Sequence, residues 1–74
     1  MDAQKTGKLI SIKRKNMNMT QGELAKKLHI TDKAVSKWER GLSFPDISLL
    51  IPLSEILNIS LYDLLKGEDE NGKK

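Results

Sequence analysis

Four polar side chains recur at helical spacing between positions 32 and 37, and their chemistry suits contact with DNA bases. Lysine donates hydrogen bonds to guanine O6 and N7, and a carboxylate can accept one from the amino group of cytosine. Ala34, Val35 and Trp38 would form the opposite side of the same helix. If that apolar side faces a core, the outward side chains that would read bases are Asp32, Lys33, Ser36 and Lys37.

Simpler roles for these residues stay open at this point. Asp32 stands in the first turn of the expected helix, where a negative charge complements the helix dipole without touching DNA. Lys33 and Lys37 lie one turn apart and can reach the same groove, but lysines also bind phosphate or are simply solvated. Trp38 is expected to pack in the core and not to stack on a base.

Two short helices would position this set of side chains. The first begins at Thr20, because Thr20 and Glu23 have the T-x-x-E spacing of a capping box. Thr31 can cap the second helix. Only His29 and Ile30 lie between the two, and so short a connection makes helices cross steeply, as in a helix-turn-helix. We therefore interpret this segment as a DNA-reading unit.

From about Gly7 to Gly67, the chain resembles the XRE family, which is the phage repressor and Cro class of helix-turn-helix proteins. The matching residues are Thr20, Gln21, Leu24, Ala25, Leu28, Val35, the run from Ser36 to Gly41, Pro45, Leu57, Ser60, Asp63, Leu64 and Leu65. The resemblance implies an all-α, five-helix, lambda-repressor-like fold. One helix-turn-helix domain would span residues 1–67, with its central unit at 20–40.

The resemblance also suggests which residues contact DNA. Gln21 would bind phosphate and brace the recognition helix, while the base readers would include Asp32, Lys33 and Lys37. Arg14 and Glu39 match a pair that forms a salt bridge between the first and third helices. The residues expected near phosphate are Thr20, Gln21, Lys26, Thr31, Arg40 and Ser43.

The turn after the second helix departs from the family pattern, because His29 replaces the usual Gly. Such a residue often takes a positive φ, which His tolerates better than β-branched residues do. We interpret His29 as a turn residue. A metal role is not expected, since the chain has no Cys and no second His to complete a site.

The N-terminal segment is predicted to support this unit as a first helix over residues 5–15. Ile10, Met17 and Met19 match positions that the family buries. A fourth helix is predicted over residues 45–57, with Pro45 as its first residue.

Pro52 lies inside this fourth helix, so a kink or a split is expected near Ser48. A fifth helix would run from a cap at Ser60 to Gly67. The stretch 68–74 contains no apolar residue and is expected to be a disordered polar tail.

Charge is divided unevenly along the sequence. Residues 1–41 contain ten Lys and Arg against four Asp and Glu, whereas residues 42–74 contain three against six. The basic half includes the helix-turn-helix. A basic face attracts DNA at long range and supplies affinity that depends on salt and not on sequence.

Composition excludes several other classes of protein. The 74 residues make one small domain, and the longest apolar run, at 49–53, is far too short to span a membrane. No nucleophile, base and acid are spaced for hydrolysis, and no phosphate-binding glycine loop is present. We expect no enzyme activity, cofactor, metal or small-molecule ligand, and a cytoplasmic, nucleoid-associated protein.

Two functions are consistent with these features. The first is a sequence-specific regulator that binds double-stranded DNA at an inverted repeat as a homodimer, with a dimer contact through Leu61, Tyr62 and Leu65. The alternative is a protein-interaction module, such as an antitoxin that neutralises a partner protein. The chain could also be one domain of a longer regulator.

Overall fold

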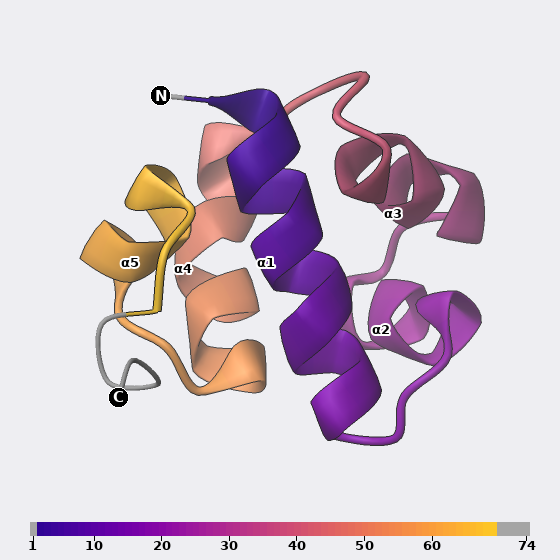
Figure 1. The fold of residues 1–74 in the computed structure, drawn as a ribbon. Helices are drawn as coiled ribbons and strands as arrows, with labels where there is room; N and C mark the ends of the chain where they lie inside the picture. The colour runs from indigo at the N-terminus through magenta and orange to yellow at the C-terminus, as the bar shows by residue number, and fades with distance from the viewer. Residues whose placement is uncertain (1, 70–74) are drawn as a thin grey trace.

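The computed structural model describes residues 2–69, which form five α-helices and no strand. The helices are α1 (Ala3–Asn16), α2 (Gln21–Leu28), α3 (Asp32–Glu39), α4 (Ile47–Leu57) and α5 (Leu61–Lys66). Helix α1 lies between the α2–α3 pair on one side and α4 with α5 on the other (Figure 1). The predicted all-α, five-helix fold is confirmed.

Each helix begins after a residue whose side chain accepts a hydrogen bond from the first turn. These N-cap residues are Asp2, Thr20, Thr31, Asp46 and Ser60. At α2 the capping box is complete: the Thr20 hydroxyl accepts from the Glu23 amide at 3.0 Å, and the Glu23 carboxylate accepts from the Thr20 amide at 2.8 Å. The caps predicted at Thr20, Thr31 and Ser60 are confirmed.

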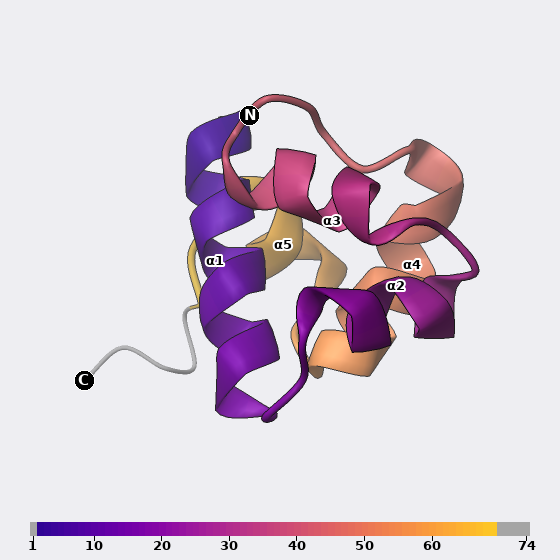
Figure 2. The same cartoon turned by 90° about the vertical axis from the view of Figure 1, so that its right-hand side faces the viewer.

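The connection between α2 and α3 is as short as the sequence predicts. His29 ends α2 with a φ of 59°, which confirms it as a turn residue in the left-handed region. The next amide, that of Ile30, donates to the Ala25 carbonyl at 3.0 Å and so closes the turn. Figure 2 shows α2 and α3 facing the viewer, joined by this turn.

Helix α4 begins two residues later than predicted. Pro45 is buried in the preceding loop, and the helix starts at Ile47. Had Pro45 been the first helical residue, Phe44 would have been the N-cap, and its side chain has no acceptor. Asp46 supplies one, and its carboxylate accepts from the Ser48 amide at 3.0 Å. The predicted start at Pro45 is therefore wrong.

The split predicted near Ser48 does not occur, since α4 is continuous from Ile47 to Leu57 with Pro52 inside it. Proline removes the donor that would reach the Ser48 carbonyl. Ser48 is exposed, so water can supply that donor, while Leu50 and Leu53 on either side of the proline are buried in the core. Their packing keeps the two halves of the helix together.

The core joins all five helices. Its fully buried side chains include Ile10 from α1, Leu24 from α2, Val35 from α3, Leu53 from α4 and Leu64 from α5. The prediction for Ile10 is confirmed, and Met19 packs partly buried against this cluster.

The prediction for Met17 is wrong, since its side chain is 45% exposed. Met17 ends α1, where its amide donates to the carbonyls of Lys13 and Arg14, and its side chain points away from the core.

Backbone contact between α1 and α3 determines where α3 lies. A Cβ added at Gly7 would be 1.9 Å from the Trp38 carbonyl oxygen, so only glycine allows the two helices to approach this closely. On the other side of α1, the buried Thr6 hydroxyl donates to the Leu64 carbonyl of α5 at 2.9 Å. Helix α1 is thus fixed to both halves of the domain.

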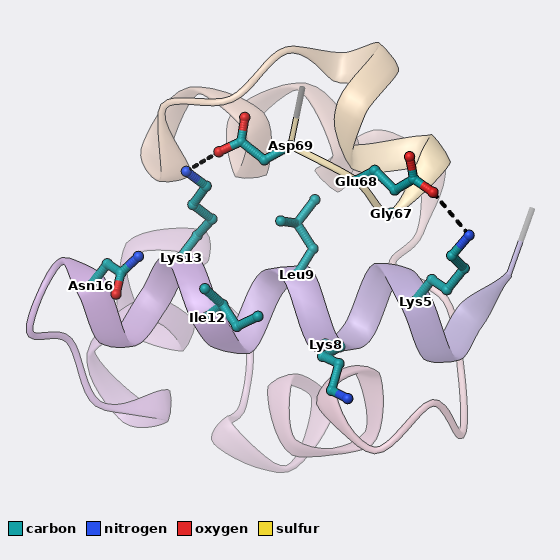
Figure 3. Close-up of a pocket in the computed structure, with 9 residues that line it drawn as sticks. All are labelled: Lys5, Lys8, Leu9, Ile12, Lys13, Asn16, Gly67, Glu68 and Asp69. Carbon is teal, nitrogen blue, oxygen red and sulfur yellow. Dashed lines mark hydrogen bonds and ion pairs between the residues drawn. The ribbon is translucent and has the colours of Figure 1, made fainter. Parts of the chain in front are cut away.

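The chain after α5 returns along α1. Glu68 pairs with Lys5 at 3.1 Å, and Asp69 pairs with Lys13. Figure 3 shows these two acidic residues above α1, beside a shallow groove of about 450 Å³ that Leu9 and Ile12 help to line. The remainder of the tail predicted to be disordered, residues 70–74, lies outside the described residues.

Candidate nucleic-acid interface

A buried polar network holds the C-terminal end of α3. The Glu39 carboxylate accepts from Arg14 Nε at 2.6 Å and Nη2 at 3.0 Å, and also from Gln21 Nε2 at 2.9 Å. Arg14 donates in addition to the Met19 carbonyl at 2.7 Å. The side chains of Arg14 and Glu39 are 9% and 7% exposed. This network ties α1, α2 and α3 together, and it has the salt bridge that the sequence predicts.

The protonation of Glu39 follows from this network. Burial alone raises the pKa of its carboxyl, but the hydrogen bonds from Arg14 and Gln21 outweigh burial and lower that pKa below its ordinary value of 4.5. The hydrogen bond to Glu39 likewise raises the pKa of Arg14. Both groups are therefore charged at neutral pH. The negative charge of Glu39, which lies next to the candidate DNA surface, is balanced inside the protein by the positive charge of Arg14.

The opposite face of α3 is exposed. Val35 and Trp38 are buried, as predicted, whereas Asp32, Lys33 and Lys37 point into solvent. Among the described residues, none of these three side chains has a hydrogen-bond or ion-pair partner. They are available to an external ligand.

Ser36 differs from the other three candidate base readers. It is partly buried, and its hydroxyl accepts a hydrogen bond from Arg40 Nε at 3.2 Å. Arg40 Nε also donates to the Ser36 carbonyl oxygen at 3.3 Å, so its one hydrogen is shared between the two acceptors. The sequence predicts Arg40 near phosphate and Ser36 near bases, but the contact between their side chains was not predicted. Their i, i+4 spacing on one helix was the available signal.

The candidate phosphate contacts lie in two places around α3. Thr20 and Gln21 form the start of α2, and the hydrogen bond from Gln21 to Glu39 brings them close to the end of α3. Arg40 and Ser43 follow α3 and are exposed, so the structure brings these four residues to one end of the helix. Thr31 is exposed at the opposite end, where it caps α3.

Lys26 is less closely associated with α3 than the other candidates. It is exposed on α2 and lines a shallow depression together with Asn18, Met19, Glu23 and Lys27. Within residues 2–69, no hydrogen bond or ion pair joins it to α3.

No three His, Cys, Asp or Glu side chains within residues 2–69 gather closely enough to hold a metal ion. None of the helices described is sufficiently long and apolar to cross a membrane.

Known proteins share this arrangement. A family model described as helix-turn-helix matches residues 10–64. The transcriptional regulator DicA of Escherichia coli is 42% identical over 64 residues, which cover 86% of this chain and 47% of DicA. The regulator ImmR of Bacillus subtilis is 40% identical over 68 residues, which cover 92% of this chain and 53% of ImmR.

A solved structure also matches this chain. The P22 c2 repressor in complex with a synthetic operator matches with a TM-score of 0.80 and 35% identity, over 85% of this chain and 96% of that one. The chain spans between 28% and 53% of the length of the curated relatives it matches. The chain therefore belongs to the XRE family of helix-turn-helix domains, a family of DNA-binding transcriptional regulators with a non-enzymatic role.

Proposed function

We propose that this chain is a sequence-specific DNA-binding regulator that inserts α3 into the major groove of an inverted-repeat operator as a homodimer. The observation that carries the proposal is the contrast between the two sides of α3. Its inner side is fixed by Val35, Trp38 and the Glu39 network, and on its outer side Asp32, Lys33 and Lys37 are exposed without a partner among the described residues. Preorganised donors and acceptors on a helix of this width suit the major groove.

Base readout is proposed for Asp32, Lys33, Ser36 and Lys37. Lys33 and Lys37 lie one turn apart on the exposed side and can donate to adjacent guanines. Asp32 combines two roles in this proposal, since its charge complements the start of α3 and its free oxygen can accept from cytosine.

Phosphate contact is proposed for Thr20, Gln21, Lys26, Thr31, Arg40 and Ser43. The support comes from the position of all but Lys26 beside the ends of α3, from the exposure of all but the partly buried Gln21, and from the excess of basic residues in the first 41 positions. The first backbone amides of a helix favour a nearby anion, which suits Thr20 and Gln21 at the start of α2. Such contacts set the position of the protein on the duplex and supply affinity for every sequence.

Dimerisation is proposed because one small domain contacts only a modest area of DNA, and two half-sites about 34–36 Å apart restore affinity. The proposed contact is Leu61, Tyr62 and Leu65 on α5, of which Leu61 is 38% and Tyr62 66% exposed. Helix α4 offers a second exposed apolar face, at Ile47 and Ile51. Charged substitutions at Tyr62 and at Ile47, compared by sedimentation, identify which face is used. Wild-type protein that stays monomeric at high concentration, both free and on DNA, would overturn the dimer.

Selection from a random DNA pool at near-physiological salt tests the function as a whole. We expect enrichment of a short inverted repeat, with its half-site spacing set by the dimer. Weak, salt-sensitive binding to every duplex without enrichment would contradict a sequence-specific regulator and favour the protein-interaction module. A regulator of this kind would act on DNA in the cytoplasm, at the nucleoid.

A further inference from the structure

The contact between Arg40 and Ser36 joins two residues with different proposed roles in DNA binding. We propose that Arg40 is a positioning residue, which presents the Ser36 hydroxyl to the bases as a hydrogen-bond donor and couples this readout to the phosphate backbone. The inference rests on the proposed function, because it concerns how α3 reads an operator. It goes further by naming the chemical character of the base that Ser36 selects.

The chemistry of the hydroxyl carries the first step. A serine hydroxyl has one hydrogen to donate and two lone pairs to accept with. Arg40 Nε donates to one lone pair of this oxygen at 3.2 Å and shares its hydrogen with the Ser36 carbonyl oxygen at 3.3 Å. Within a helix, serine often donates its hydrogen to the carbonyl four residues earlier, but Ser36 donates no hydrogen bond among the described residues. The hydrogen is therefore left for an external acceptor.

The charge of Arg40 strengthens this bias. A guanidinium beside the hydroxyl oxygen repels any second donor that approaches it, including the amino group of cytosine. Purine N7, guanine O6 and thymine O4 are acceptors in the major groove. The contact thus predicts that Ser36 favours guanine, adenine or thymine over cytosine at the position it touches.

The shape of the guanidinium carries the second step. Nε and the terminal nitrogens of arginine donate in fixed directions from one rigid plane. Nε is directed at Ser36, and the terminal nitrogens of Arg40 have no partner among residues 2–69. One side chain can therefore hold the base-reading hydroxyl and bind a phosphate oxygen at the same time. A lysine in its place has the same charge but only one nitrogen, so it cannot do both with this geometry.

The experiment compares wild-type protein with Arg40→Lys, Ser36→Ala and the double variant, after circular dichroism and thermal unfolding have shown that each is folded. The probes are the duplex selected from the random pool by the wild type, all its single-base substitutions, and one scrambled duplex. The readout is the affinity for each duplex at one salt concentration. A purely phosphate-binding Arg40 would change all these affinities by the same factor.

We expect both single variants to lose the preference against cytosine at the same operator position, by roughly threefold to tenfold, the value of one hydrogen bond. We also expect the double variant to lose no further preference there. An Arg40→Lys variant that weakens all duplexes equally, with the wild-type base preferences retained, would overturn the inference and leave the proposed function standing. Failure of the wild type to enrich any sequence would overturn the proposed function, and the inference with it.

Discussion

Helix α3 has two sides with different physical roles. On its inner side, Trp38 is 4% exposed, Val35 is fully buried, and Glu39 accepts three hydrogen bonds from α1 and α2. On its outer side, Asp32, Lys33 and Lys37 are exposed and have no partner within the described residues. The inner side contributes stability and the direction of the helix, and the outer side contributes groups whose hydrogen bonds remain to be made with a ligand.

This division explains how so small a domain can have a precise surface. Short helices of eight residues are not stable alone, so α3 depends on tertiary contacts for its conformation. Those contacts lie on one side only, and substitutions on the two sides should therefore affect different measurements.

Removal of the Trp38 side chain should affect the inner side most. Trp38→Ala is expected to lower the free energy of unfolding by about 3–5 kcal/mol, because a large buried side chain is lost and a cavity remains. Urea unfolding measures the change. Lys37→Ala, on the outer side of the same helix, is the matched control and should stay within about 0.5 kcal/mol of wild type. Similar losses in the two variants would contradict the separation.

Removal of the Glu39 carboxylate should cause the second-largest loss of stability. Glu39→Ala leaves the buried Arg14 guanidinium and the Gln21 amide without their acceptor, and should cost about 2–3 kcal/mol of stability. Asp32→Ala removes the other acidic residue of α3, which is exposed, and should cost less than about 1 kcal/mol through the helix dipole. If both substitutions cost the same, the network has no special role in holding α3.

Acid should also reduce the stability that the Glu39 network contributes, by part of the loss expected for Glu39→Ala. The pKa of Glu39 is lowered in the folded protein, so its charge stabilises the fold above pH 4.5, and this contribution is lost as the pH falls through the folded pKa. Asp46, whose pKa is lowered by hydrogen bonds from Ser48, adds a loss in the same direction. Asp46 is present in both wild type and Glu39→Gln, so the stability gap between them reports Glu39 alone. This gap should narrow from pH 7 to pH 3, whereas a constant gap would contradict the assignment.

The smallest effect is expected for a phosphate contact away from α3. Lys26→Ala should leave stability unchanged and weaken binding to all duplexes alike. The affinity for DNA falls as salt is raised from about 50 to 200 mM. Because Lys26→Ala lacks one phosphate contact, the factor by which its affinity falls should be roughly threefold smaller than the factor for wild type. Titrations of selected and scrambled duplexes at both salt concentrations measure this. A loss confined to the selected duplex would instead assign Lys26 to base readout.

Local features of this fold are predictable from the sequence because local chemistry determines them. The caps at Thr20, Thr31 and Ser60 depend on a hydroxyl beside the first turn, and the left-handed turn at His29 depends on the short connection that follows. The start of α4 was misplaced because proline at the first helical position and aspartate at the N-cap compete as signals. The side-chain acceptor of Asp46 decided between them.

Of the features that depend on packing between helices, the Arg14–Glu39 salt bridge and the burial of Ile10 were predicted through the family resemblance, and the others were not predictable. No local signal shows that Gly7 lies against the Trp38 carbonyl, since the two residues are far apart in sequence. The exposure of Met17 and the pairing of Asp69 with Lys13 likewise depend on where α1 lies in the finished fold. For the candidate interface, the sequence predicted which residues are exposed on α3, but the contact between Arg40 and Ser36 required the side-chain geometry.

The outer side of α3 is proposed to read sequence, and the double variant Lys33→Ala, Lys37→Ala is the decisive test. The measurement is the ratio of its affinities for the selected duplex and for a scrambled duplex of equal length, relative to wild type. We expect the difference in binding free energy that this ratio represents to fall by about 1–3 kcal/mol for each lysine that reads a base. The free energy of unfolding should be unchanged. Equal weakening on both duplexes, with the ratio preserved, would show that these lysines bind only phosphate and would contradict the account.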